Sequence, residues 1–243
     1  MTRLDIELVA RGLAPTRARA RDAILRGHVT VDGRRADRPG ADVGADAGIT
    51  LSDPAAGYVS RAALKLIHAL DHFGYDPAGR RVLDLGASTG GFTQVLLQRG
   101  AAEVVAIDVG HGQLAPAVAA DPRVRNREGL NARALTAEDA GGAIGAVVSD
   151  VSFISQRLVL PPALALAEPG AFAVVLAKPQ FEVGRAAIGR GGLVRDPVVA
   201  ERSAIALRDW LAGQPGWTVD GLVPSPIAGG DGNREFLLGA QRR

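Results

Sequence analysis

Apolar positions change their spacing near residue 60 of the chain. From there on, apolar runs of strand length alternate with stretches of helical spacing, such as Ala62 to Leu70. The strand-like runs cover 81–86, 104–109, 146–150 and 172–177, and a later one starts at Glu235. Strands that alternate with helices predict a mostly parallel sheet with crossover helices on both faces. Ligands of such sheets bind at the carboxyl ends of the strands.

The first 51 residues follow a different pattern. Leu4, Ile6, Leu8 and Val9 begin one apolar helical face, and Pro15-Thr16 predicts the start of a second helix that runs to about Arg26. The stretch 28–34 then resembles a short strand that enters an Asp-Gly turn. Residues 1–51 are therefore expected to form a small domain, 52–59 a linker, and 60–243 the larger domain.

Charge is distributed unevenly, although the net charge is only +2. The stretch from Arg11 to Arg35 holds two acids, Asp22 and Asp32, and seven arginines: Arg11, Arg17, Arg19, Arg21, Arg26, Arg34 and Arg35. Such a cluster is either a phosphate-binding patch or an ordinary solvated face, and charge alone leaves both open.

Three short stretches in this domain resemble the S4 RNA-binding domain. They are Arg3-Leu4-Asp5, the helix start 16–20, and the strand and turn 27–33. The resemblance implies an α+β domain that binds structured RNA through its arginine-rich helix and the following turn. The expected RNA-binding residues are Arg3, Arg17, Arg19, Arg21 and Arg34.

Composition excludes several kinds of chemistry. The chain has no cysteine, which removes disulfides, thiolate metal sites and a thiol nucleophile, and its four histidines are too scattered to form a metal site. No apolar run approaches the roughly 20 residues needed to cross a bilayer. We therefore expect no metal and a cytoplasmic protein.

A glycine-rich turn follows the first strand of the larger domain. The stretch 84–92 reads Asp-Leu-Gly-Ala-Ser-Thr-Gly-Gly-Phe, and Asp108 ends the next strand. It lacks the spacing of dinucleotide and P-loop motifs and resembles a methyltransferase turn. The glycines could also make only a tight turn. The predicted cofactor is S-adenosyl-L-methionine, bound by Asp84, Gly86, Ala87, Ser88, Thr89, Gly90, Gly91, Phe92, Asp108, Asn131 and Asp150.

Lysine is rare in this chain, which has 26 arginines and two lysines, Lys65 and Lys178. Such a bias leaves lysine mainly where a compact or deprotonatable amine is required, although either residue could be a chance survivor on the surface. Asp150 and Glu235 lie at strand ends, where a carboxylate is either catalytic or the cap of a helix.

In order and context, Lys65, Asp150, Lys178 and Glu235 resemble the Lys-Asp-Lys-Glu tetrad of FtsJ-like RNA ribose methyltransferases. The stretches 58–61, 149–155 and 178–182 further resemble the TlyA family, which joins an S4 domain to that catalytic domain. The resemblance implies a Rossmann-like class I methyltransferase with a mostly parallel seven-stranded sheet. It also implies 2'-O-methylation of ribose, with cytidine of ribosomal RNA as the target and ribosomal RNA or ribosomal subunits as partners. The stretch 127–133 matches the family only loosely, so the resemblance does not settle whether Asn131 contacts the adenine side of the cofactor.

A ribose hydroxyl must be aligned with the methyl group and lose its proton as it attacks. We hypothesise that Lys178 orients and deprotonates that hydroxyl, that Lys65 and Asp150 set its charge state, and that Glu235 holds the lysines. Three alternatives stay open: a noncatalytic RNA-binding or ribosome-assembly factor, an RNA base methyltransferase, and a membrane-active toxin. The glycine-rich segment 184–195 is expected to be an exposed loop that either closes over RNA or has no such role.

Overall fold

The computed structural model describes residues 1–243, apart from the side chain of Ala186. The chain forms two compact units, Met1–Gly57 and Tyr58–Arg243. Their boundary falls inside the predicted linker 52–59, but most of that stretch packs with the first unit. Asp53 forms an ion pair with Arg26 at 2.6 Å, and Ala55 is buried. These contacts explain why the compact part extends beyond residue 51.

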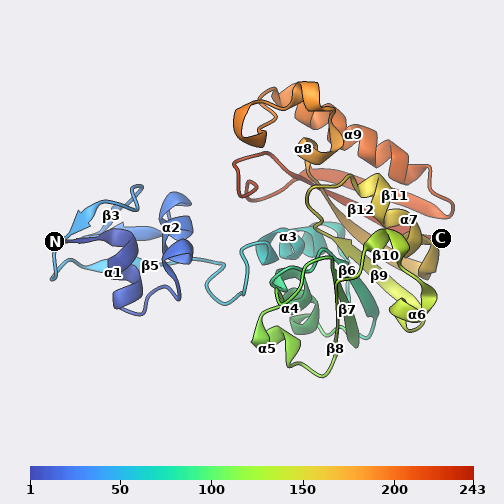
Figure 1. Ribbon diagram of the computed structural model, residues 1–243, viewed down its shortest axis with the longest axis horizontal. Coiled ribbons are helices and arrows are strands. Elements are labelled where there is room, and N and C mark those ends of the chain that lie inside the picture. The colour runs from blue at the N-terminus through green and yellow to red at the C-terminus, as the bar shows by residue number, and fades with distance from the viewer. The chain divides into compact units, whose positions relative to one another are not determined.

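The first unit contains the two helices and the hairpin that the sequence predicts (Figure 1). The hydroxyl of Thr16 accepts a hydrogen bond from the Arg19 N–H at 3.2 Å and caps the second helix. Asp32 and Gly33 have φ of 49° and 75°, as a two-residue hairpin turn requires. The elements are β1 (Thr2–Arg3), α1 (Leu4–Ala10), α2 (Arg17–Leu25), β2 (Val29–Val31), β3 (Arg34–Arg35), β4 (Asp42–Val43) and β5 (Ile49–Leu51).

The second unit is built on a seven-stranded sheet in the order β11-β12-β10-β9-β6-β7-β8. Strand β12 is antiparallel to both of its neighbours, and the other strand pairs are parallel. The predicted mostly parallel sheet is therefore confirmed. Its strands are β6 (Arg81–Leu85), β7 (Glu103–Asp108), β8 (Val124–Glu128), β9 (Ile144–Ser149), β10 (Ala167–Ala177), β11 (Trp217–Pro224) and β12 (Phe236–Arg242).

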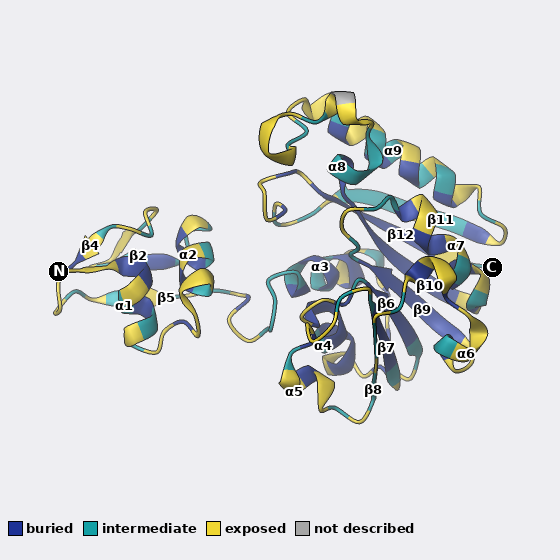
Figure 2. Cartoon of the chain, in the orientation of Figure 1, coloured by how far each residue is buried: buried dark blue, intermediate teal, exposed yellow. Residues whose placement is uncertain are grey.

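Helices cover both faces of this sheet, because alternate strand residues point to opposite sides and both sides are apolar. Figure 2 shows the buried strands between the helices. One layer holds α3 (Ala63–Phe73), α4 (Gly91–Gln98) and α5 (Pro116–Ala119). The other holds η1 (Ala132–Ala134), α6 (Ala137–Ala140), α7 (Gln156–Leu166) and α9 (Pro197–Ala212). The short turns α8 (Pro179–Glu182), η2 (Arg185–Ala187) and η3 (Arg190–Gly192) link β10 to α9.

The strand order brings three predicted site residues to one edge of the sheet. Ala177 at the end of β10 lies opposite Phe236 at the start of β12. Lys178 and Glu235 are the next residues at that edge. Strand β9 pairs with the other side of β10, and Asp150 follows its last residue. Lys178 therefore lies between the strands that carry Glu235 and Asp150.

Candidate active site

The glycine turn after β6 is packed tightly against the turn after β9. Gly86 has φ of +81°, and a Cβ at this position would come within 3.0 Å of the backbone of Val151. Only glycine allows both this conformation and this approach. The two turns thereby form one continuous wall, which brings Asp150 beside the glycine-rich stretch.

Two cavities adjoin this wall. The larger has a volume of about 510 Å³, within the range of small-molecule sites. The smaller, of about 160 Å³, shares Gly86, Ser88, Asp150 and Ser152 with it and includes Lys178. Of the predicted cofactor residues, Gly86, Ser88, Asp108, Asn131 and Asp150 line the larger cavity, and Gly86, Ala87, Ser88, Thr89, Gly91, Phe92 and Asp150 line the smaller. Asp84 and Gly90 line neither cavity.

The larger cavity has the chemistry of a nucleoside site. The Asp108 carboxylate accepts hydrogen bonds from the N–H groups of Ser88 and Gly110, both at 2.8 Å, and its oxygens keep lone pairs for ribose hydroxyls. Much of the remaining lining is apolar and includes Ile107, Leu130 and Ile154. A polar end and an apolar slot suit the ribose and adenine of S-adenosylmethionine, so the residues fit the expected cofactor.

Glu128 holds the loop that follows Asp108, a role that we did not predict from the sequence. Its carboxylate accepts three backbone hydrogen bonds at 2.7 to 3.0 Å, from Gly112, Gln113 and Leu114. These hydrogen bonds lower the pKa of Glu128, and the bond from the Leu114 N–H has the largest effect. The side chain of Asn131 accepts from the Arg133 N–H at 3.1 Å and begins η1. Contact between Asn131 and adenine stays a prediction.

Asp84 lies beneath the glycine turn, fully buried in the sheet. The Thr93 hydroxyl donates to its Oδ2 at 2.6 Å, while its Oδ1 has no hydrogen-bond partner among the described residues. Burial first, and then the negative charge of Asp150, raise the pKa of Asp84 to about 7. Asp84 is therefore mostly protonated below about pH 7, where it supports the turn from below as a neutral group.

The raised pKa of Asp84 predicts a pH-dependent stability. Between about pH 4 and pH 7 the folded chain retains a proton that the unfolded chain has lost. The free energy of unfolding should therefore fall as pH rises through this window, by up to about 4 kcal/mol. Urea denaturation at pH 5 and pH 8 measures this change. Asp84→Asn, which keeps an acceptor for Thr93, should remove most of the difference, and identical pH profiles for the two proteins would contradict the assignment.

Lys178 and Asp150 form an ion pair at the wall that the two cavities share. The Lys178 Nζ lies 2.6 Å from Asp150 Oδ1, and it donates to Ser152 Oγ at 2.7 Å and to the Asp150 carbonyl at 3.2 Å. The lysine is buried except for a small exposed fraction. Ser152 was not among the predicted site residues, and only its place two residues after Asp150 could have suggested it.

Lys65 and Glu235 form a second buried ion pair. Lys65 Nζ, on α3, lies 2.5 Å from Glu235 Oε2, and the two side chains are 8% and 2% exposed. We expected Glu235 to hold both lysines, but among the described residues its only ion pair is with Lys65. The reason is the strand order, because Lys178 turns toward the β9 side and pairs with Asp150. The tetrad is therefore arranged as two pairs.

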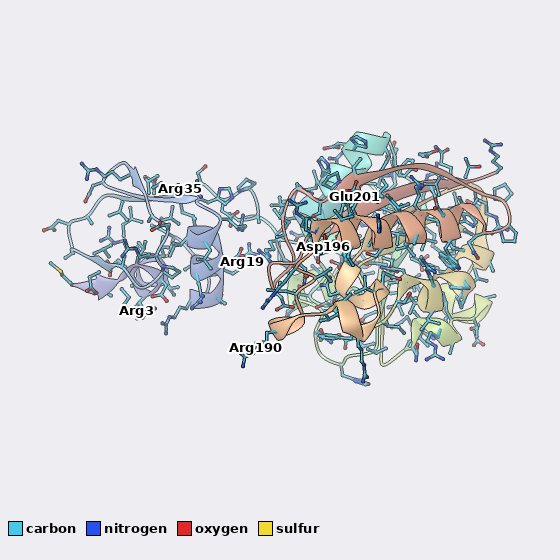
Figure 3. The ribbon with its side chains drawn as sticks, turned by 90° about the horizontal axis from the view of Figure 1, so that it is seen from above. Arg3, Arg19, Arg35, Arg190, Asp196 and Glu201 are labelled. Carbon is cyan, nitrogen blue, oxygen red and sulfur yellow. The ribbon has the colours of Figure 1, made fainter. Side chains whose placement is uncertain are left out.

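The arginines predicted to bind RNA differ in their surroundings within the first unit. Arg3 and Arg17 both form ion pairs with the buried Asp5, at 3.0 and 2.8 Å. Arg19 donates to the carbonyl of Ala55 at 2.5 Å. Arg21 and Arg34 are exposed and have no ion pair among the described residues. Figure 3 labels Arg3 and Arg19 in this unit.

Comparison with known proteins follows the same division of the chain. Residues 58–242 match the FtsJ-like methyltransferase family, and residues 2–49 match the S4 domain. The chain is 48% identical over 237 residues to the 16S/23S rRNA (cytidine-2'-O)-methyltransferase TlyA of Mycobacterium tuberculosis, which covers 97% of this chain and 88% of that protein.

Two solved structures resemble the chain closely, and both carry the name hemolysin. The protein from Streptococcus thermophilus is 39% identical with a TM-score of 0.77, over 99% of this chain and 88% of that one. The protein from Lactococcus lactis is 44% identical with a TM-score of 0.73, over 76% of this chain and 89% of that one. The described part of this chain contains no helix long and apolar enough to cross a membrane. With its S4 domain and its glycine-rich cofactor site, the chain belongs to the FtsJ-like methyltransferases of the TlyA family, which use S-adenosylmethionine.

Proposed function

We propose that this protein transfers a methyl group from S-adenosylmethionine to the 2'-oxygen of a ribose in ribosomal RNA, with cytidine as the target. The observation that carries the proposal is the Lys178–Asp150 pair at the junction of the two cavities. The activity of the M. tuberculosis relative, an rRNA (cytidine-2'-O)-methyltransferase, supports ribosomal RNA as the substrate. A ribosomal RNA substrate also favours a cytoplasmic location.

The cofactor fits across the two cavities. We propose that adenosine occupies the larger one, against Asp108, and that the methionine part occupies the smaller one, along Ser88 to Phe92. Bound there, S-adenosylmethionine supplies an electrophilic methyl group on its sulfonium. The backbone of the glycine turn lines one part of this junction, and Asp150 and Lys178 line another.

Lys178 has the position required to orient the attacking hydroxyl. Its Nζ is held by Asp150 on one side and by the Ser152 hydroxyl on the other. A ribose 2'-hydroxyl that takes the place of the Ser152 hydroxyl would lie within hydrogen-bond reach of Lys178 Nζ. Lys178 first releases its own proton to solvent, and the neutral amine then accepts the hydroxyl proton as the methyl group is transferred. Lys65 and Glu235 support the same sheet edge from α3 and β12.

Phe153 offers a surface for the target base. This residue lines the larger cavity, is 91% exposed, and has φ of +66°, a backbone conformation that bulky residues rarely adopt. Its ring lies 5.3 Å from that of Phe181, the third residue after Lys178. An exposed aromatic ring in a strained backbone conformation, one residue after the Ser152 that contacts Lys178, suits stacking on an unpaired base.

Replacing Phe153 with glycine should therefore separate stability from activity. The backbone strain is relieved, so the free energy of unfolding should rise by about 1 kcal/mol. Methyl transfer to ribosomal RNA should fall about 10-fold or more, because one stacked base contributes about 1–3 kcal/mol. Cofactor affinity is measured in parallel, since Phe153 also borders the larger cavity. Wild-type transfer rates in Phe153→Gly would exclude the stacking role.

The reaction itself can be tested in cells. Ribosomal RNA from bacteria that produce the chain should acquire an alkali-resistant linkage, because a methylated 2'-oxygen cannot attack the adjacent phosphate. Cells that produce the Lys178→Ala protein at the same level should lack it. A new methyl group on a base instead of a ribose would favour the base methyltransferase alternative, and no new methyl group would favour a noncatalytic RNA-binding factor.

A further inference from the structure

Four arginines lie on two loops next to the strand ends that carry Lys178 and Glu235. Arg185, Arg190 and Arg195 belong to the segment 184–195, and Arg234 belongs to the loop between β11 and β12. All four are exposed, and none forms an ion pair with another described residue. We name these four residues the arginine rim. Unpaired guanidinium groups are well suited to bind phosphate, because each offers a planar set of donors.

One buried side chain, that of Asn233, connects the two loops by hydrogen bonds. Asn233 Oδ1 accepts from the Val194 N–H and its Nδ2 donates to the Gly192 carbonyl, both at 3.0 Å. Asn233 is 3% exposed, and its own carbonyl accepts from the Gly229 N–H at 2.9 Å. The segment 184–195 is thus held in a defined position on the β11–β12 loop. Figure 1 shows both loops at the same end of this unit.

Both loops are also direct extensions of the catalytic residues. The short helix α8 starts immediately after Lys178, and the segment 184–195 begins two residues after that helix ends. Asn233 precedes Glu235 by two residues. A phosphate bound on the rim would therefore have a fixed position relative to both buried ion pairs.

The remaining features of the rim agree with an open binding surface. Gly191 and Gly192 have φ of +76° and +77° and no other atom within 4 Å of the position of a Cβ, so their backbone is accessible to a ligand. Figure 3 shows the labelled Arg190 extending from its loop into open space. Two acids, Asp196 and Asp231, share these loops, and Asp196 accepts from the Val198 N–H at 2.8 Å as the cap of α9. Four arginines against two acids leave the surface basic.

We infer that the arginine rim binds the phosphate backbone of the substrate RNA next to the modified nucleotide, as a contact made by the methyltransferase domain itself. This inference rests on the proposed function for the identity of the RNA. Phosphate contacts fix the orientation of a nucleic acid and carry little sequence information. The rim would accordingly hold the RNA on the methyltransferase domain, while alignment of the target ribose and selection of the nucleotide depend on other residues.

The test uses the full chain and purified bacterial ribosomal subunits. Arg190→Gln and the triple variant Arg185→Gln/Arg190→Gln/Arg195→Gln are compared with Arg243→Gln, which removes one exposed arginine at the C-terminus. Binding constants for the subunits are measured between about 50 and 200 mM salt. The logarithm of the association constant falls linearly with the logarithm of the salt concentration, and each lost phosphate contact makes this slope shallower by about 0.7–0.9. Unchanged cofactor affinity shows that the variants are folded.

If the rim binds RNA, the salt dependence of binding should become shallower by about one unit for Arg190→Gln and by about two to three units for the triple variant. Both variants should have a raised KM for RNA and a nearly unchanged kcat. Arg243→Gln should match the wild type. If the triple variant matches Arg243→Gln in slope and KM, the rim is not an RNA contact, although the proposed reaction could still stand. If the wild type binds subunits without transferring methyl groups, the proposed reaction fails, and the salt slopes still decide the role of the rim.

Discussion

Replacing Lys178 with alanine is expected to reduce the rate of methyl transfer by about 10²–10⁴-fold, the range typical of a lost general base. The amine is held between Asp150 and Ser152 at the junction of the two cavities, and the described part of the chain places no other lysine there. Single-turnover rates on ribosomal RNA at saturating cofactor measure the effect. The dissociation constant for S-adenosylmethionine should change much less than the rate.

Lys178→Arg tests what the amine contributes. The guanidinium keeps the positive charge, but it is larger and does not lose its proton. An inactive arginine variant would favour proton transfer or the need for a compact amine, whereas an active one would reduce the role of Lys178 to electrostatic positioning. Normal methylation by a folded Lys178→Ala protein would remove Lys178 from the mechanism.

Replacing Lys65 with methionine is expected to lower the free energy of unfolding by about 3–5 kcal/mol, because it leaves the Glu235 carboxylate buried without its partner. The two side chains are 8% and 2% exposed, so water cannot replace the lost ion pair. Urea denaturation at neutral pH measures the change. Activity should fall as well, since the pair borders the edge that carries Lys178.

The double variant Lys65→Met/Glu235→Leu is the matched control, because it removes both charges. Replacing a buried ion pair by apolar residues of similar volume is often neutral for stability, so most of the loss should be recovered. The double variant should nevertheless remain impaired in methyl transfer. If Lys65→Met is as stable as the wild type, the buried ion pair does not stabilise the fold. If Lys65→Met/Glu235→Leu is fully active, the pair has no part in catalysis.

The sequence predicts where the proposed catalytic side chains lie better than it predicts which of them form pairs. Asp150, Lys178 and Glu235 could be assigned to strand ends because each lies at the end of a strand that contains an apolar run. These runs are 144–148 in β9, 171–177 in β10 and 236–240 in β12. Their pairing depends on the sheet order, in which β12 lies beside β10 and antiparallel to it. That order comes from contacts distant in sequence, so Glu235 could not be assigned to Lys65 alone before the structure was known.

Edge strands were the hardest elements to predict. Strand β8 reads Val-Arg-Asn-Arg-Glu, and none of its residues is buried, because it is the last strand of the sheet. Strand β11, at the opposite edge, is likewise mostly half-buried. Neither produces the apolar run that marked the central strands. The roles of Phe153 and Asn233 were equally hidden, since they depend on backbone strain and on a loop about 40 residues away in the sequence.

Transfer of a labelled methyl group from S-adenosylmethionine to purified ribosomal subunits tests the central claim most directly. The RNA is digested to nucleosides after incubation with the wild-type chain or with Lys178→Ala, and the labelled nucleoside is identified. We predict label on the 2'-oxygen of cytidine with the wild type and none with the variant. Label on a base, or no label in any RNA although the protein binds the cofactor, would contradict ribose methylation as the function of this site.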